Sequence, residues 1–153
     1  MKDKIENLSA SLKKKIKDLK FNKLPDKIKE LVKDLFADEE ILIVSESDLD
    51  LTAIMHKNYL IVTDKHLAVF SFNPDYLKSK KKIRYNSLQL ESIEEIKIEL
   101  SDNIAFLSFT VHNKNQQILC FPQSEIYRFE KVAKKIVKII SKENSEIRLF
   151  KVF

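Results

Sequence analysis

Short runs of alternating apolar and polar residues fill the middle of this chain, and their period is that of β-strands. The clearest run places Ile96, Ile98 and Leu100 on one face and Lys97 and Glu99 on the other, as in a half-buried strand. The pattern predicts seven strands, at residues 40–46, 53–63, 66–72, 82–86, 93–100, 104–112 and 116–121. The second and third strands form a hairpin, NYLIVTDKHLAVFSF at residues 58–72, whose polar turn is Thr63-Asp64-Lys65.

After Pro122 the apolar period changes to that of an α-helix. Over roughly 18 residues from Ser124, apolar residues recur at steps of three and four, at Ile126, Phe129, Ala133, Ile136 and Ile140. Such a face must cover apolar surface, and short antiparallel strands do not close both ends of a barrel with their own side chains. The sequence therefore predicts an α+β, mainly β fold: a seven-stranded antiparallel barrel capped by a C-terminal helix.

Before the strands, residues 1–37 are predicted to form a helical N-terminal arm. An apolar stripe at helical spacing marks a first helix, and its members are Ile5, Leu8, Leu12, Ile16 and Leu19. A second helix follows Pro25, with Ile28, Leu31, Val32, Leu35 and Phe36 on its inner face. Three interpretations of the arm stay open: packing on the barrel or of one helix on the other, contact with anionic lipid, or self-association through the stripe.

Charge separates this arm from the rest of the chain. Residues 1–36 contain 11 lysines and 6 acidic residues, whereas the remainder has 17 basic and 17 acidic residues, so the net charge of +5 lies in the arm. The arm lysines that we predict to contact an anionic surface are Lys13, Lys14, Lys15, Lys17 and Lys20. Residues 38–141 form the predicted barrel domain. Residues 142–153 form an apolar tail, which we expect to add a strand to this domain or to a neighbour.

The chain contains no glycine, and this changes which turns and motifs it can use. Positions with positive φ must be taken by Asn or Asp, and candidates lie between the runs at Asn73, 102–103 and 113–115. Glycine-rich phosphate loops are excluded. Cys120 is the only cysteine and no apolar run approaches membrane-span length, so we expect a cytoplasmic protein, peripheral at the inner membrane surface if the arm binds lipid.

The order of seven strands and one helix, together with the hairpin, resembles a bacterial pleckstrin-homology-like (PH-like) domain of the YokE-like or GRAM-related kind. The residues that carry the resemblance are Leu60-Ile61-Val62-Thr63-Asp64-Lys65-His66-Leu67 and Ile83-Arg84-Tyr85. His66 departs from the pattern, because an arginine is usual there. The resemblance implies a binding module and covers residues 38–141.

In eukaryotic relatives of this fold, phosphoinositides sit against basic residues between the first two strands. The corresponding residues here, 45–50, are acidic and would repel a phosphate headgroup. The basic run lies one hairpin later, as a solvated loop or as a second contact for an anionic surface, and its charged residues are Lys78, Lys80, Lys81, Lys82 and Arg84. Aromatic residues near it are few, which argues against nucleic acid.

No catalytic constellation is recognisable. His56, His66 and His112 are far apart in sequence, and none has the spacing of a metal ligand. We expect a non-enzymatic binding or adaptor module without metal or cofactor, whose partner is a protein or an anionic membrane surface, with no small-molecule substrate evident. The alternative is a self-assembling structural protein, and an enzyme that joins His66, His112 and Cys120 in one pocket is a distant third.

Overall fold

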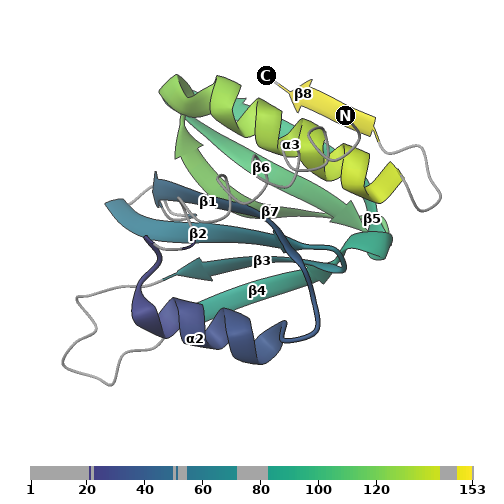
Figure 1. Ribbon diagram of the computed structural model, residues 1–153. Helices are drawn as coiled ribbons and strands as arrows, with labels where there is room; N and C mark the ends of the chain where they lie inside the picture. The colour runs from purple at the N-terminus through teal and green to yellow at the C-terminus, as the bar shows by residue number, and fades with distance from the viewer. Residues whose placement is uncertain are drawn as a thin grey trace, which may run out of the picture.

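The computed structural model describes residues 21, 23–49, 51, 55–71, 83–141 and 148–152 (Figure 1). Its strands are β1 (Ile41–Leu49), β2 (Met55–Thr63), β3 (His66–Ser71), β4 (Arg84–Gln89), β5 (Ile93–Ser101), β6 (Ile104–Val111), β7 (Lys114–Pro122) and β8 (Arg148–Val152). The α-helices are α2 (Asp26–Leu35) and α3 (Ile126–Ser141), and the short 3-10 helices are η2 (Leu90–Ser92) and η3 (Gln123–Glu125).

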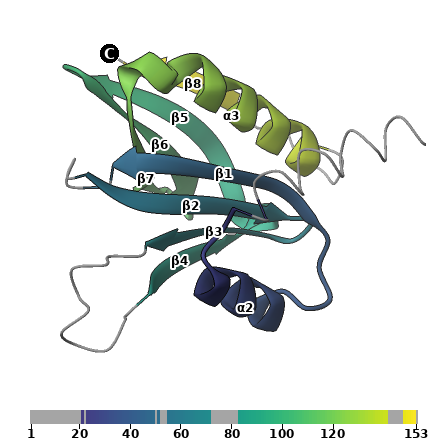
Figure 2. The same ribbon diagram turned by 60° about the vertical axis from the view of Figure 1, so that its left-hand side comes forward.

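Seven antiparallel strands form the two halves of a bent sheet with the strand order β4-β3-β2-β1-β7-β6-β5. The halves meet at β1 and β7, which share a single residue pair, Leu49 with Cys120. Figure 2 shows the two halves folding toward each other, with α3 across the open end. This is a PH-like arrangement, so the predicted fold class is confirmed.

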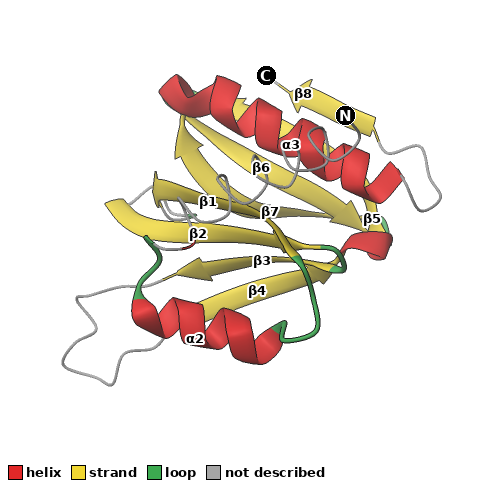
Figure 3. Cartoon of the chain, in the orientation of Figure 1, coloured by secondary structure: helices red, strands yellow, loops and turns green. Residues whose placement is uncertain are grey.

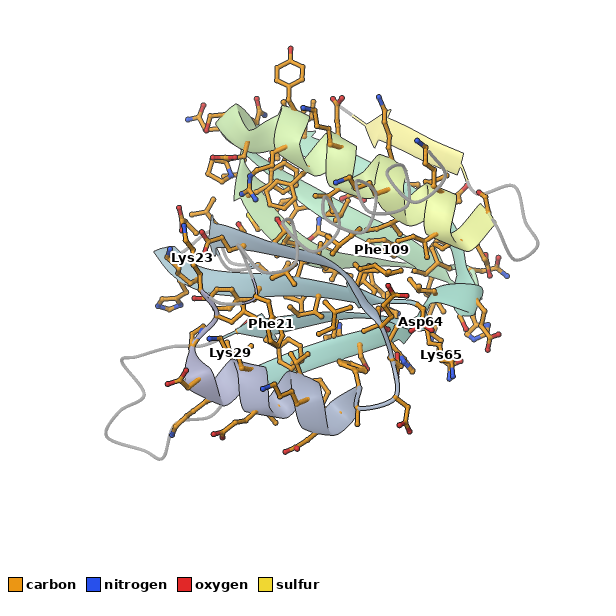
Figure 4. All side chains as sticks on the ribbon, in the orientation of Figure 1. Phe21, Lys23, Lys29, Asp64, Lys65 and Phe109 are labelled. Carbon is orange, nitrogen blue, oxygen red and sulfur yellow. The ribbon has the colours of Figure 1, made fainter. Side chains whose placement is uncertain are left out.

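The main core lies between the two halves and beneath α3. Its fully buried members come from both halves and include Leu60, Leu67, Ile96 and Phe109, and Figure 4 shows Phe109 among them. From α3 the buried side chains are Phe129, Val132, Ala133, Ile136 and Ile140. Four of these belong to the predicted stripe, and the fifth predicted residue, Ile126, is half-buried against the same core. The helix is therefore the predicted cap.

Helix α2 forms a second core on the outer face of β1–β3 (Figure 3). Ile28, Val32 and Phe36 are buried there against Ile61 and Phe70 of β2 and β3. Of the predicted inner face, Leu35 is instead 40% exposed. The second predicted helix thus packs on the sheet, whereas the first, with its stripe at residues 5–19, lies outside the described residues.

The C-terminal strand β8 extends the β5 edge of the sheet. It runs parallel to β5, with Arg148 opposite Glu95 and Val152 opposite Glu99. This places residues 148–152 in the sheet of their own chain, which is one of the two outcomes expected for the tail.

Two predicted strand positions need correction. The first strand was expected to end at residue 46 and to be followed by an acidic loop, but β1 continues to Leu49, and Ser47 is buried and donates a hydrogen bond to the Cys120 carbonyl. The fourth strand was expected at 82–86, whereas β4 runs from Arg84 to Gln89. Five of its six side chains are exposed, so it lacks the apolar alternation that would mark its position.

Positive φ angles fall where a glycine-free chain must use other residues. Among the described residues, those with positive φ are Asp102 (46°), His112 (50°) and Asn113 (64°). Asp102 and Asn113 lie in two of the three turns predicted for this role, and the third, at Asn73, lies outside the described residues. His112 was not predicted, although histidine, like Asn and Asp, is enriched in this region of φ/ψ space.

Candidate functional site

The interior of the sheet is polar near the turn between β1 and β2. The Ser47 hydroxyl donates to the Cys120 carbonyl, which links β1 to β7. The Asn58 amide donates to the Leu49 carbonyl at 2.8 Å and accepts a hydrogen bond from the Ser71 hydroxyl. These buried polar side chains therefore find their hydrogen-bond partners within the protein.

Arg128 joins the start of α3 to β1. Its Nε donates to Glu125 Oε2 at 2.7 Å, one terminal nitrogen to Ser45 Oγ at 2.8 Å, and the other to the Glu46 carbonyl at 2.7 Å. The guanidinium carbon lies 4.4 Å from the centre of the Phe129 ring. The Arg128 guanidinium thus donates to groups of the protein itself. These hydrogen bonds hold α3 against β1, a strand that shares only one residue pair with β7.

The rim beside this region is acidic, as predicted. Lys57 Nζ lies 3.6 Å from Glu46 Oε2 and 3.5 Å from Asp48 Oδ1. The Glu46 carboxylate raises the pKa of the Lys57 ammonium, and Asp48 raises it further. Burial raises the pKa of the neighbouring Tyr59 hydroxyl. Two carboxylates facing one ammonium leave net negative charge at this rim.

A second polar cluster joins the β2–β3 turn to the segment between α2 and β1. Thr63 Oγ1 accepts hydrogen bonds from the backbone N–H groups of Lys65 and His66, and donates to Glu39 Oε1 at 2.6 Å. His66 Nδ1 lies 2.8 Å from the same oxygen. Figure 4 places Asp64 and Lys65 at this turn. His66, which departs from the PH-like sequence pattern, therefore has a structural contact.

We expect Thr63→Val to lower the free energy of unfolding by about 1–3 kcal/mol, because the buried hydroxyl serves two backbone donors and one carboxylate. Urea denaturation followed by circular dichroism measures the change. Thr110→Val is the matched control, since the Thr110 hydroxyl has a single contact of 3.5 Å to Glu95. Equal destabilisation of the two variants would contradict the role assigned to Thr63.

The outer face of β5 and β7 carries a further polar cluster around Glu99. Its carboxylate accepts hydrogen bonds from the Asn115 amide at 2.8 Å and from the Gln117 amide at 3.0 Å. Burial alone would raise the pKa of the Glu99 carboxyl, but these hydrogen bonds and the charge of Lys97 outweigh it, so the pKa is lowered. Glu99 therefore stays ionised and structurally engaged.

The outward side of α3 is strongly basic. Its exposed residues include Tyr127, Lys131, Lys134, Lys135 and Lys138, and Tyr127 is 76% exposed. The helix holds five basic residues and one acidic residue, a net charge of +4. Over the rest of the described residues, 11 basic and 15 acidic residues give −4. The charge of the folded body is thus strongly polarised toward α3.

The residues predicted to contact an anionic surface are only partly placed. Arg84 is exposed at the start of β4. The arm lysines 13–20 and the loop lysines 78–82 lie outside the described residues. Sequence reasoning missed the lysines of α3, although their steps of three and four residues were the available signal.

Histidines and the cysteine are distributed over separate elements. His66 lies at the β2–β3 turn, His112 at the β6–β7 turn, and Cys120 is buried in β7, roughly 20 Å along the strand from its first residue, Lys114, at about 3.3 Å per residue. In the part of the chain that the structure covers, no three His, Cys, Asp or Glu side chains are grouped to hold a metal ion. No described helix has the length and apolarity needed to span a membrane.

A solved structure shares this architecture at low sequence identity. The hSac2 domain from the human phosphoinositide phosphatase Sac2, which has a PH-like fold, matches with a TM-score of 0.57 and 13% identity, covering 84% of this chain and 89% of that domain. No protein-family model matches the sequence, and no curated protein matches it. The likeness shows the fold alone, and the narrower YokE-like or GRAM-related resemblance stays a prediction.

Proposed function

We propose that this protein is a non-enzymatic PH-like binding module that attaches to an anionic membrane surface through the basic segment 1–25. The observation that carries the proposal is the position of the charge. Helix α2 packs on the sheet, and its three lysines are balanced by three acidic residues, Asp26, Glu30 and Asp34. Segment 1–25 therefore holds the whole excess, eight lysines against three acidic residues.

The described body supports a binding role over a catalytic one. Its interior is filled by apolar side chains and its buried polar end is hydrogen-bonded within the protein. The acidic rim around Glu46 and Asp48 disfavours a phosphate group at that end. Positive charge outside the core is consequently the feature with which this module can recognise a partner.

Substitution of three arm lysines tests the proposal. We expect the unchanged protein to sediment with vesicles of 30% phosphatidylserine and to lose this binding as salt rises, because exposed charges are screened. Lys13→Gln, Lys14→Gln and Lys17→Gln together should weaken binding about a hundredfold, at about 1 kcal/mol for each lysine near an anionic membrane. Failure of the unchanged protein to bind these vesicles, or salt-independent binding, would refute the membrane role.

Self-assembly is the alternative for the same segment. Residues 148–152 pair with β5 of their own chain, so assembly would depend on the stripe from Ile5 to Leu19. Light scattering at tens of micromolar should give the mass of a monomer under the proposed function. A stable oligomer lost on Leu12→Lys would favour assembly instead.

A further inference from the structure

We infer that the outer face of α3 is a second contact for an anionic membrane surface, built on the folded body and separate from segment 1–25. This inference rests on the proposed function, and it adds a defined orientation to it. The lysine face, as we call it, consists of Lys131, Lys134, Lys135 and Lys138, with Tyr127 one turn before them.

The lysine face has a fixed direction because the opposite side of α3 is locked into the core. Phe129 and Ile136 have no exposed surface, and the Phe121 and Phe129 rings stack with their centroids 4.2 Å apart. Lys138 lies seven residues after Lys131, or about 10 Å further along the helix. The four ammonium groups therefore extend from one straight, outward-facing row.

Among the described residues, α3 and the short helix before it contain two carboxylates. Glu130 is the only acidic residue of α3 and is half-buried, and Glu125, just before the helix, is engaged by Arg128 at 2.7 Å. The excess of acidic residues lies elsewhere in the described chain, including the rim around Glu46 and the segment 38–40. A negatively charged plane would consequently attract the α3 side and repel the remainder.

The chemistry of the face favours a membrane over nucleic acid. Lysine is a hydrated point charge that suits a diffuse anionic surface, whereas reading of bases relies on Arg, Asn and Gln or on stacked aromatic rings. The outward side chains of α3 provide none of these apart from one tyrosine. A 76% exposed tyrosine beside lysines is the combination that lies well at a membrane–water interface.

We expect segment 1–25 and the lysine face to contact the same membrane surface. Helix α2, at whose start this segment ends, lies on the opposite side of the body from α3 (Figures 1 and 2). We expect segment 1–25 to contribute affinity, while α3 determines which side of the body faces the lipid.

The test compares two full-length triple variants that lower the net charge equally. The α3 variant carries Lys131→Gln, Lys134→Gln and Lys138→Gln. The control variant carries Lys33→Gln, Lys65→Gln and Lys114→Gln, three substitutions of exposed lysines outside α3. With vesicles of 30% phosphatidylserine we expect about a hundredfold weaker binding for the first, at about fivefold per lysine, and less than about threefold for the control. Unchanged melting temperatures show that both variants are folded.

The outcomes separate the inference from the proposed function. If the unchanged protein does not bind the vesicles, the proposed function fails and this inference with it. If it binds and the α3 variant binds equally well, or if both variants weaken binding to the same extent, only the lysine face is refuted. The α3 variant is also tested for binding to a 20-base-pair DNA duplex. If it loses DNA binding that the unchanged protein shows and still binds vesicles, the ligand of the lysine face is nucleic acid and the membrane assignment is overturned.

A fluorescent label reports the orientation independently of affinity. Tyr127→Cys and Asp34→Cys place a polarity-sensitive dye on α3 and on α2, while the native Cys120 is 1% exposed and protected from labelling. Vesicles should shift the emission to the blue at position 127 and leave position 34 unchanged. Equal shifts at both positions, or a shift at position 34 alone, would overturn the orientation.

Discussion

Phe129→Ala is expected to lower the free energy of unfolding by about 3–5 kcal/mol, because it removes a large side chain from the centre of the core. Phe129 is fully buried, stacks on Phe121 and supports the Arg128 guanidinium on its ring. Its loss leaves a cavity beneath α3 that the surrounding strands cannot fill by small movements. Urea denaturation of the variant, followed by far-ultraviolet circular dichroism, measures the change.

Tyr127→Ala is the matched control, since it truncates another aromatic residue two positions away on the same helix. Tyr127 is 76% exposed, so we expect a change within about 0.5 kcal/mol. A loss below 1 kcal/mol for Phe129→Ala would mean that α3 is not anchored as described. The lysine face would then have no fixed direction, and the orientation inferred for membrane contact would lose its basis.

The strength of this anchor links the core to function. Lysines on a loosely attached helix would attract an anionic membrane through net charge alone. On an anchored helix they present a fixed row, so that substitution of Lys131, Lys134 and Lys138 should differ from substitution of three lysines elsewhere. The α3 variant and the control variant lower the net charge equally, so a difference in their vesicle binding measures the effect of where the lysines lie.

Apolar periodicity predicted most of the fold because most of the core is apolar. Ile96 and Ile98 are fully buried at alternate positions of β5, and the stripe of α3 enters the core as its steps of three and four indicate. The rule failed where the interior is polar. Ser47 is buried in β1 yet lies beyond the predicted end of that strand, because its hydrogen-bond partner, the Cys120 carbonyl, is remote in sequence.

The lysine face escaped prediction for a different reason. Summed over residues 37–153 the charge is zero, and a sum conceals that α3 is basic while the described remainder of the chain is acidic. Sequence can show which lysines are spaced along a helix. Only the fold shows that their side faces outward while Glu125 is occupied by Arg128.

Helix α2 belongs to the predicted arm 1–37 and packs on the sheet, which is one of the interpretations left open for that arm. The arm 1–37 was defined by its charge and its helical apolar pattern. These two criteria do not distinguish a helix that packs on the sheet from one that does not. Packing against Ile61 and Phe70 decides the matter for α2. The basic part of the N-terminal region therefore ends where α2 begins, directly after Pro25.

Ile28→Ala should lower the free energy of unfolding by about 2–5 kcal/mol if α2 is an integral part of the folded body. Ile28 has no exposed surface, whereas Leu35, on the same helix, is 40% exposed. Leu35→Ala is consequently the control, with an expected change below about 1 kcal/mol. Denaturation with urea distinguishes the two variants. If both changes are small, α2 contributes little to the body, and it would belong functionally with the basic arm rather than with the sheet that it covers.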